Sequence, residues 1–348
     1  MIEFIRTWVA VTWGMVTQSA LLLIFGFILA GIIRAIITPE MIRALFGQHS
    51  AAQIIKASLI GIPLPLCSCS VLPVAAQLRR SGLSREGTVS FLISTPETGV
   101  DSIALSYRLL GPYFAIIRPL AALIVALFGG LMTSLFARDA ITTPPSIAVA
   151  STSPTKNLLQ RLWDGQNYIA FDVLPDLAYY LFLGFIVAGL AAVLLPENLL
   201  RSGVSPIWQY TAAIAISLPL YVCATSSTPL AAVFLNLGVL PGAILTFLLV
   251  GPATNLASIV VQKQILGTKG MIVMTTSLTV AAIFCGILVD LLFGSQLGSI
   301  PIDPGRVHEE LRWYDLSAAI LLAAVMTYYS VRHYYRKFLV RRQAAIEV

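Results

Sequence analysis

Two cysteines and three prolines interrupt an apolar run in Gly61-Ile62-Pro63-Leu64-Pro65-Leu66-Cys67-Ser68-Cys69-Ser70-Val71-Leu72-Pro73. Proline lacks the amide hydrogen that a helix needs, and its ring clashes with the preceding turn. The range 51–80 is therefore expected to break near its middle. Inside a bilayer, irregular backbone is tolerated only where protein or a water-filled cavity covers it, and transporters build midplane binding sites from broken helices. The pattern predicts a transport site at this break.

The composition of the whole chain is that of a polytopic membrane protein. Hydrophobic residues make up 57% of the sequence and charged residues only 11%, compared with about 25% charged residues in soluble proteins. The range 202–262 contains no Asp, Glu, Lys, Arg or His, and one membrane crossing needs about 20 apolar residues, so several crossings lie within it. The uncharged range 7–33 is too long for a signal peptide and predicts a retained first helix.

The formal net charge of +6 comes from basic residues in predicted loops and at the C-terminus, which is a topology signal rather than a sign of nucleic-acid binding. We expect the lipid bilayer and a small solute as partners. Four cysteines are too few for a disulfide scaffold, so free thiols are expected. The sequence contains no phosphate-binding glycine loop, no HExxH and no nucleophile elbow. The chain is therefore predicted not to be an enzyme and to need no cofactor.

The sequence contains an internal duplication. The stretch Gly26-Phe27-Ile28-Leu29-Ala30-Gly31 recurs as Gly184-Phe185-Ile186-Val187-Ala188-Gly189, and Pro65-Leu66-Cys67-Ser68-Cys69 pairs with Pro219-Leu220-Tyr221-Val222-Cys223. Further residues recur at one constant spacing, with Pro73, Gly82, Phe91, Pro96, Ser102 and Gly111 answered by Pro229, Gly238, Phe247, Pro252, Ser258 and Gly267. Shared apolar composition does not produce such an aligned series, so the chain is expected to consist of two related halves.

Each half is expected to contain the same four parts. These are a first membrane helix (11–37 and 174–195), the broken cysteine segment, a second broken segment (84–110 and 240–266) and a plain final helix (119–137 and 270–289). A tail helix over about 315–332 carries aromatic residues at both ends, as interfacial helices do. The predicted organisation is a first transmembrane repeat (1–138), a linker (139–172), a second transmembrane repeat (173–294), and an external loop, tail transmembrane helix and basic C-terminus (295–348).

The basic residues predict the orientation of the two halves. The C-terminus is expected in the cytoplasm by the positive-inside rule, because it carries Arg332, Arg336, Lys337, Arg341 and Arg342. If the cysteine segment is a re-entrant hairpin, the halves are inverted, with Arg79, Arg80 and Arg85 inside and Arg108 and Arg118 outside. If that segment crosses the membrane instead, Arg79, Arg80 and Arg85 move outside, and the halves are still inverted. The predicted fold is an all-α polytopic membrane protein of two inverted structural repeats with broken or re-entrant helices plus a C-terminal tail helix.

The cysteines of the first break could form a soft ligand site. In an extended break Cys67 and Cys69 lie two residues apart and can face the same side, and Cys223 aligns with Cys69. Thiolates select Cu(I), Zn and similar thiophilic species, and two or three sulfurs also suit a trivalent arsenical. The predicted metal-binding set is therefore Cys67, Cys69 and Cys223. Alternatively, these cysteines act only as small buried hydrophobes, which is the role expected for Cys285.

The second break carries two carboxylates in Ser94-Thr95-Pro96-Glu97-Thr98-Gly99-Val100-Asp101-Ser102. If a helix continues there, Glu97 and Asp101 share a face. Ionisable groups at membrane depth usually mark ion, proton or substrate pathways, so both are candidates for proton coupling or cation attraction. The alternative is that they lie near the interface, where they are solvated or pair with Arg108 or Arg118. The predicted substrate-binding set is Cys67, Ser68, Cys69, Ser70, Thr95, Cys223, Thr225, Thr254, Asn255 and Ser258.

The two broken motifs and the aligned Pro219-Leu220-Tyr221-Val222-Cys223-Ala224-Thr225 resemble the ArsP-type predicted permease family, and most closely its copper/zinc-efflux branch. The resemblance covers residues from about 19 to 290. It implies a bacterial inner-membrane permease that exports thiol-reactive metals or trivalent organoarsenicals, with Cys67 and Cys69 as the binding element. Many members of the metal branch have a His- or Cys-rich loop between the halves, whereas residues 137–172 contain neither residue type.

The sequence as a whole predicts a secondary transporter of the bacterial inner membrane. We expect it to export a soft metal ion or trivalent arsenical through a thiol site at the interface of the repeats, coupled to protons or another ion. Two alternatives stay open. One is a membrane thiol-redox enzyme in which Cys67 and Cys69 form a transient disulfide, and the other is a permease for small sulfur compounds.

Overall fold

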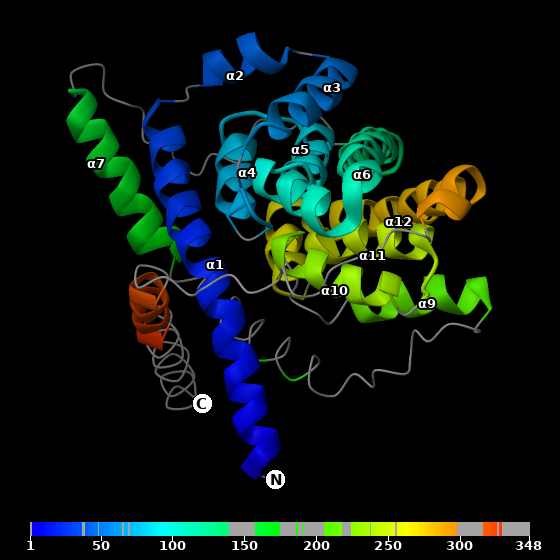
Figure 1. Ribbon diagram of the computed structural model, residues 1–348. Coiled ribbons are helices and arrows are strands. Elements are labelled where there is room, and N and C mark those ends of the chain that lie inside the picture. The colour runs from blue at the N-terminus through cyan, green and yellow to red at the C-terminus, as the bar shows by residue number, and fades with distance from the viewer. Residues whose placement is uncertain are drawn as a thin grey trace, which may run out of the picture.

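The computed structural model (Figure 1) describes residues 2–36, 39–47, 49–64, 66–68, 70–138, 157–174, 186, 190, 205–217, 224–236, 238–254, 256–297, 316–325 and 327–328. These residues form helices and connecting turns, and no β-strand occurs among them. The all-α class predicted from the sequence is therefore confirmed for this part of the chain.

The helices follow one another in two series. The first contains α1 (Ile2–Ile36), α2 (Pro39–Phe46), α3 (Ser50–Gly61), α4 (Val71–Arg80), α5 (Arg85–Glu97) and α6 (Val100–Phe136). The helix α7 (Leu158–Tyr168) and a π-helical turn, η1 (Ile169–Val173), come next. The second series contains α9 (Pro206–Ser217), α10 (Ala224–Asn236), α11 (Pro241–Thr254) and α12 (Leu256–Leu297), and a further helix covers Leu316–Val325.

Both predicted breaks of the first half are present. The helix α3 ends at Gly61 and α4 begins at Val71, so the described residues between them, which include Pro63 and Cys67, are not part of a helix. The second break is shorter, because α5 ends at Glu97 and α6 begins at Val100. The start of α5 is fixed by Ser84, whose side chain accepts a hydrogen bond from the amide of Gly87 at 3.1 Å, as is usual for an N-terminal serine cap.

The long helices α6 and α12 each contain one sharp kink. Gly111 has φ 86° and ψ 176°, and Gly267 has φ 75° and ψ 167°. Side chains with a Cβ rarely adopt positive φ, so glycine is the residue that permits this turn. Each long helix is therefore two helical pieces joined at a glycine, and the two kinks lie at the spacing found in the sequence duplication.

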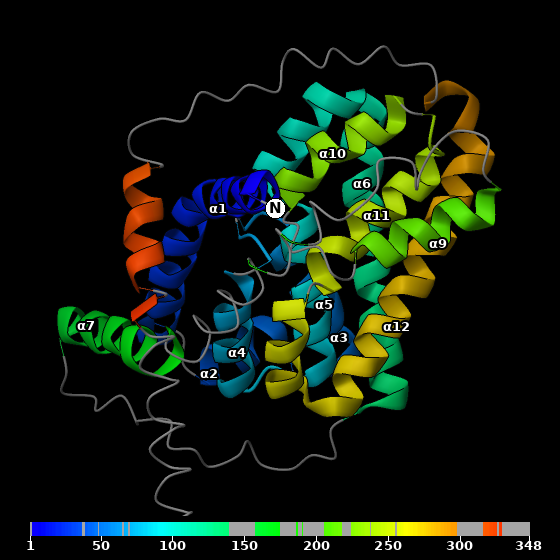
Figure 2. The same cartoon turned by 90° about the horizontal axis from the view of Figure 1, so that it is seen from below.

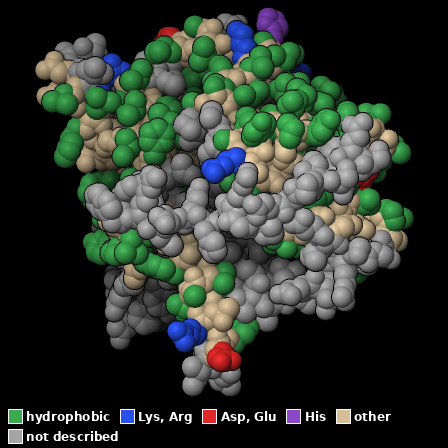
Figure 3. All heavy atoms as spheres, viewed as in Figure 1, with side chains coloured by type: hydrophobic (Ala, Val, Ile, Leu, Met, Phe, Trp, Pro, Cys, Tyr) green, Lys and Arg blue, Asp and Glu red, His purple; other side chains and the backbone are tan. Residues whose placement is uncertain are grey.

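The surfaces of these helices are apolar. Ser102–Phe136 and Val261–Phe293 are long and apolar enough to cross a bilayer, and a third crossing is counted if Leu23–Ile36 and Glu40–Phe46 form one bent span. Large hydrophobic side chains on their outer faces are exposed, among them Ile116, Leu135, Phe284 and Leu291. Hydrophobic side chains also cover most of the described surface in Figure 3. Such a surface suits lipid rather than water.

Hydrogen bonds within the two series repeat at the spacing that separates Gly111 from Gly267. The amide of Ser84 donates to Gln53 Oε1 at 2.8 Å, and the amide of Leu240 donates to Gln209 Oε1 at 2.8 Å. Likewise, Ser90 Oγ donates to the carbonyl of Ala126 at 3.1 Å, and Thr246 Oγ1 donates to the carbonyl of Ala282 at 3.2 Å. The duplicated sequence therefore builds the same contacts twice. The first joins α3 to the start of α5 and α9 to the start of α11, and the second joins α5 to α6 and α11 to α12.

Each series also has one carboxylate where its helices meet. The carboxylate comes from α5 in the first series and from α12 in the second. In the first series Glu86 on α5 accepts a hydrogen bond from Ser50 at 2.6 Å. In the second series the position of Glu86 is taken by Gly242, whose amide donates to Asp290 on α12 at 2.6 Å. Tyr210 also donates to Asp290 at 2.6 Å. The junction needs one acceptor, and either helix can supply it.

The helix α7 lies beside α1, on the side of the molecule opposite α12 (Figures 1 and 2). Gln166 donates from Nε2 to the carbonyl of Ile28 at 2.8 Å. The guanidinium of Arg34 lies 3.5 Å from the ring centroid of Tyr168, and that of Arg80 lies 5.7 Å away, so cation–π contacts join α7 to α1 and α4. This helix falls within the range 139–172 expected to be the linker, of which residues 139–156 lie outside the described part.

Close helix packing in the second series generates a prediction. A Cβ at Gly286 would lie 2.5 Å from both the carbonyl of Gly242 and Thr246 Oγ1. We expect Gly286→Ala to destabilise the protein by about 1–3 kcal/mol, because α12 must move away from α11. The matched control is Gly14→Ala, since nothing lies within 4 Å of a Cβ there. Thermal unfolding in detergent should show a lower midpoint for Gly286→Ala only, and equal midpoints would contradict the packing argument.

Candidate functional site

The cysteine break is held by its own hydroxyl groups and rests on α1. The amide of Val71 and the hydroxyl of Ser70 both donate to the carbonyl of Cys67, at 3.0 Å and 3.2 Å. The Cys67 sulfur lies 3.3 Å from Ser70 Oγ. Ser70 is fully buried, and a Cβ at Gly26 of α1 would overlap its side chain. The half-buried Cys67 thiol is therefore carried on a short turn that α1 supports.

The two breaks of the first half touch each other. Thr98 Oγ1 donates to the carbonyl of Ile62 at 3.3 Å and to the carbonyl of Ser94 at 2.8 Å. A Cβ at Gly61 would lie 2.5 Å from both Ser94 Oγ and Thr95 Oγ1. The absence of a side chain at Gly61 therefore lets the end of α3 contact the end of α5, and a hydroxyl of one break satisfies a carbonyl of the other.

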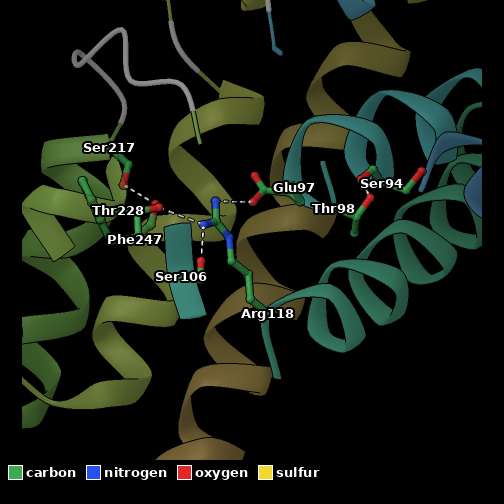
Figure 4. A network of polar contacts seen from close by, with 8 residues as sticks. All are labelled: Ser94, Glu97, Thr98, Ser106, Arg118, Ser217, Thr228 and Phe247. Carbon is green, nitrogen blue, oxygen red and sulfur yellow. Dashed lines mark hydrogen bonds and ion pairs between the residues drawn. The ribbon is translucent and has the colours of Figure 1, made fainter. Parts of the chain in front are cut away.

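A buried ion pair lies next to this contact. Arg118 Nη2 on α6 is 3.5 Å from Glu97 Oε2 at the end of α5, and both side chains are 0% exposed. Arg118 Nη1 donates to Ser106 Oγ on α6 and to Thr228 Oγ1 on α10, both at 3.0 Å. Figure 4 shows the guanidinium between Glu97 on one side and Ser106 and Thr228 on the other. The site thus joins both halves of the chain.

These positions correct two expectations. The condition for a shared face of Glu97 and Asp101, one helix running through both residues, is not met, because α5 ends at Glu97 and α6 begins at Val100. The placement of Arg118 in an outer loop is also wrong. Its guanidinium is buried within an apolar helix, where Glu97 and two hydroxyls compensate its charge. Of the alternatives left open, Glu97 pairs with Arg118, although away from solvent.

The other predicted site residues fall into two groups. Thr95 and Thr254 are buried and donate to carbonyls of their own helices, those of Phe91 at 2.8 Å and Val250 at 2.6 Å. Ser68 and Ser258 are also buried. Cys69, Cys223 and Asn255 lie outside the described residues, as do the side chains of Asp101 and Thr225.

No group of three or more His, Cys, Asp or Glu that could hold a metal ion occurs in the described part of the chain. The predicted set of Cys67, Cys69 and Cys223 is not tested by this finding, because two of its members are outside that part. Its role stays a prediction.

The contact between Glu97 and Arg118 is longer than a usual charge-assisted hydrogen bond. Charge-assisted N–H···O bonds are typically about 2.7–2.9 Å long, whereas the Glu97–Arg118 contact is 3.5 Å. Glu97 Oε1 has no hydrogen-bond partner among the described residues. Burying two charges is costly, and a buried pair is often no more stable than apolar residues of the same size. The pair therefore calls for an explanation other than stability.

The second half shows that the fold does not require these charges. At the duplication spacing, Ala253 takes the position of Glu97 and Met274 that of Arg118, and they are 3% and 1% exposed. Gln262 takes the position of Ser106 and donates from Nε2 to the carbonyl of Ala253 at 2.8 Å. The corresponding helices α11 and α12 thus pack without an ion pair, so the buried pair of Glu97 and Arg118 is specific to the first half.

Sequence reasoning missed Arg118, Ser106 and Thr228 as site residues. Arg118 had a usable signal, because it stands alone in the apolar range 109–137 and an ionisable residue there is costly. Thr228 belongs to the hydroxyl-rich range 225–228, which the sequence suggests could line the second break, but its contact with Arg118 was not expected. Ser106 had no signal, since serine is common in membrane helices and only the fold brings it to Arg118.

The chain is similar to a family of predicted permeases and to several named proteins. A family described as "Predicted permease", ArsP_1, matches residues 5–291. A Streptococcus mutans protein named as a two-component membrane permease complex subunit is 22% identical over 79% of this chain and 93% of its own length. The UPF0718 protein YcgR of Bacillus subtilis is 22% identical over 77% of this chain and 91% of its length. YraQ of Escherichia coli is 22% identical over 76% and 75%.

No solved structure gives a significant match. The family match covers most of the chain, including both broken motifs and the long apolar helices α6 and α12. It indicates a membrane transporter rather than an enzyme. The chain belongs to the ArsP_1 family of predicted permeases.

Proposed function

We propose that this protein is a secondary transporter of the bacterial inner membrane whose substrate passes the junction of the broken helices. The observation that carries the proposal is the buried contact of Glu97 and Arg118 from the first half with Thr228 from the second. A polar group that bridges two halves changes its surroundings whenever the halves rock against each other. Such rocking around a fixed midplane site is the usual basis of alternating access.

The proposal includes an inverted arrangement of the halves. Arg85 begins α5 and donates to the carbonyl of Ala137 at 2.8 Å, so it lies at the end of α6 that is remote from the Gly111 kink. A Cβ at Gly270 would lie 2.9 Å from Arg85 Cδ, and Gly270 lies three residues after the Gly267 kink of α12. The start of α5 in one half thus adjoins the kink of the other half. Oppositely directed copies would produce this contact.

Contacts of the basic residues favour the re-entrant version of the cysteine segment. Arg34 and Arg80 both face Tyr168, and Arg85 contacts Ala137 next to Arg138. Arg80 and Arg85 therefore lie at the same end as Arg34 and Arg138, as expected if α3 and α4 enter and leave on one side. The positive-inside rule assigns this end, together with the C-terminus, to the cytoplasm.

The thiol break supplies a second binding element in the proposal. Cys67 is half-buried and is held close to the second break through the Ile62–Thr98 hydrogen bond. With Cys69 and Cys223 it would capture a thiophilic substrate, such as a soft metal ion or a trivalent arsenical. This is also the substrate class of the copper/zinc-efflux branch that the motifs resemble.

The orientation proposal predicts opposite labelling of two exposed sites. Tyr113 and Lys269 lie two residues after the kinks at Gly111 and Gly267, respectively, and both are exposed. In a background with serine at the native cysteines, Tyr113→Cys should react with an impermeant maleimide from the periplasm and Lys269→Cys from the cytoplasm. Labelling of both from one side would exclude inverted halves.

The thiol proposal predicts that Cys67→Ser lowers export of a trivalent arsenical or Cd²⁺ at least about tenfold, because the sulfur ligand is lost. Flux into everted membrane vesicles measures this at matched expression. Cys285→Ser is the control, since Cys285 is buried in α12 and flux should stay unchanged. Equal flux in the Cys67 variant and the wild type would remove the thiol from the mechanism.

The transport proposal predicts that Glu97→Ala abolishes flux, because Arg118 loses its counter-charge. Leaving a buried charge unpaired costs about 3–5 kcal/mol, so folding should be monitored by unfolding midpoint and expression. Glu86→Gln provides the matched control. Glu86 is also a buried carboxylate, but its replacement amide still accepts from Ser50, and flux should remain within about twofold. Retained flux in Glu97→Ala would argue against a role for the ion pair in transport.

A further inference from the structure

We propose that Arg118 binds a small oxyanion in place of the Glu97 carboxylate, and that Glu97 holds a proton while the anion is bound. The inference rests on the proposed transport function and adds to it a second ligand besides the thiophilic substrate, an oxyanion with two or more oxygens. Glu97 then acts as a resident anion that occupies the site when no substrate is present.

The donors around the site suit an oxyanion. The guanidinium of Arg118 offers a planar set of N–H groups that matches oxyanion geometry. Arg118 Nη1 donates to Ser106 Oγ, so Ser106 acts there as an acceptor and its own hydrogen can point to another acceptor. Thr228 Oγ1 meets the same Nη1 from α10. A ligand held here would therefore contact α6 and α10, which belong to different halves.

The carboxylate that now occupies the site is easily replaced. Glu97 contacts Arg118 through Oε2 only, at 3.5 Å, and Oε1 has no hydrogen-bond partner in the described ranges. A ligand with a second oxygen would gain a bond that Glu97 does not make. In the second half, Ala253 and Met274 fill the matching positions, so the corresponding helices α11 and α12 pack without such a contact.

Charge balance requires that a proton accompanies the anion. Two negative groups beside one guanidinium repel each other strongly in a low-dielectric site, so Glu97 must become neutral as the anion binds. Within the described residues of the neighbouring helices, Arg118 is the charged group that acts on Glu97. The helix α11 contains no ionisable side chain, and the side chain of Asp101 on α6 lies outside the described part. One anion and one proton thus enter together.

Oxyanion binding to the purified full-length protein in detergent can be measured by calorimetry. The probes are thiosulfate, sulfate and phosphate. At least one probe should bind the wild type, and its affinity should fall by about tenfold per pH unit once Glu97 is ionised, because one proton is taken up. Glu97→Gln should bind the same probe about tenfold or more tightly, without this pH dependence, since no resident carboxylate competes.

The double variant Glu97→Ala with Arg118→Met is the control that keeps the fold. It copies the buried residues Ala253 and Met274 of the second half, and its unfolding midpoint should match the wild type within a few degrees while oxyanion binding is lost. The inference is overturned if no probe binds, if the double variant binds like the wild type, or if Glu97→Gln gains no affinity. Vesicle flux of the arsenical probe is scored separately, so transport without oxyanion binding would overturn this inference and leave the proposed function intact.

Discussion

The structure depends on one constraint, which is that backbone groups released at a helix break inside an apolar environment must find partners within the protein. An unpaired carbonyl or amide costs several kcal/mol where no water can reach it. Here the carbonyl of Ile62 is satisfied by Thr98, and that of Cys67 by Ser70 and Val71. The two breaks of the first half therefore have to meet, and polar chemistry gathers where they do.

Much of this fold could be predicted from the sequence, because glycine and proline indicate the local backbone conformation. The prolines around Cys67 predicted the interruption between α3 and α4. Gly111 and Gly267 were recognised as paired positions of the duplication, and the structure shows that each is a kink, with closely similar dihedral angles, inside a helix that continues past it. The glycines and prolines that align between the two halves accompany hydrogen bonds that recur in both halves. These features can be inferred from local residue preferences and from the duplication, without knowledge of the tertiary contacts.

The centre of the site could not be predicted in the same way, because its members meet only through tertiary packing. Nothing local connects Arg118 with Thr228, which come from different halves of the chain. Glu97 was identified as an ionisable residue at membrane depth, but its supposed neighbour Asp101 lies beyond the end of its helix. Counting Arg118 among loop charges failed because a buried counter-ion lets an arginine remain inside an apolar helix.

The replacement of Glu97 and Arg118 by Ala253 and Met274 has an energetic consequence for a transporter built from two copies. If the copies were identical and exchanged shapes during a cycle, the outward-open and inward-open states would have the same free energy, and the empty carrier would divide its time equally between them. Charges in one copy alone remove that degeneracy. In the inverted-repeat transporter proposed above, the empty protein would then have a preferred resting state, and the divergence of the duplicated sequence would determine which side of the membrane it faces at rest.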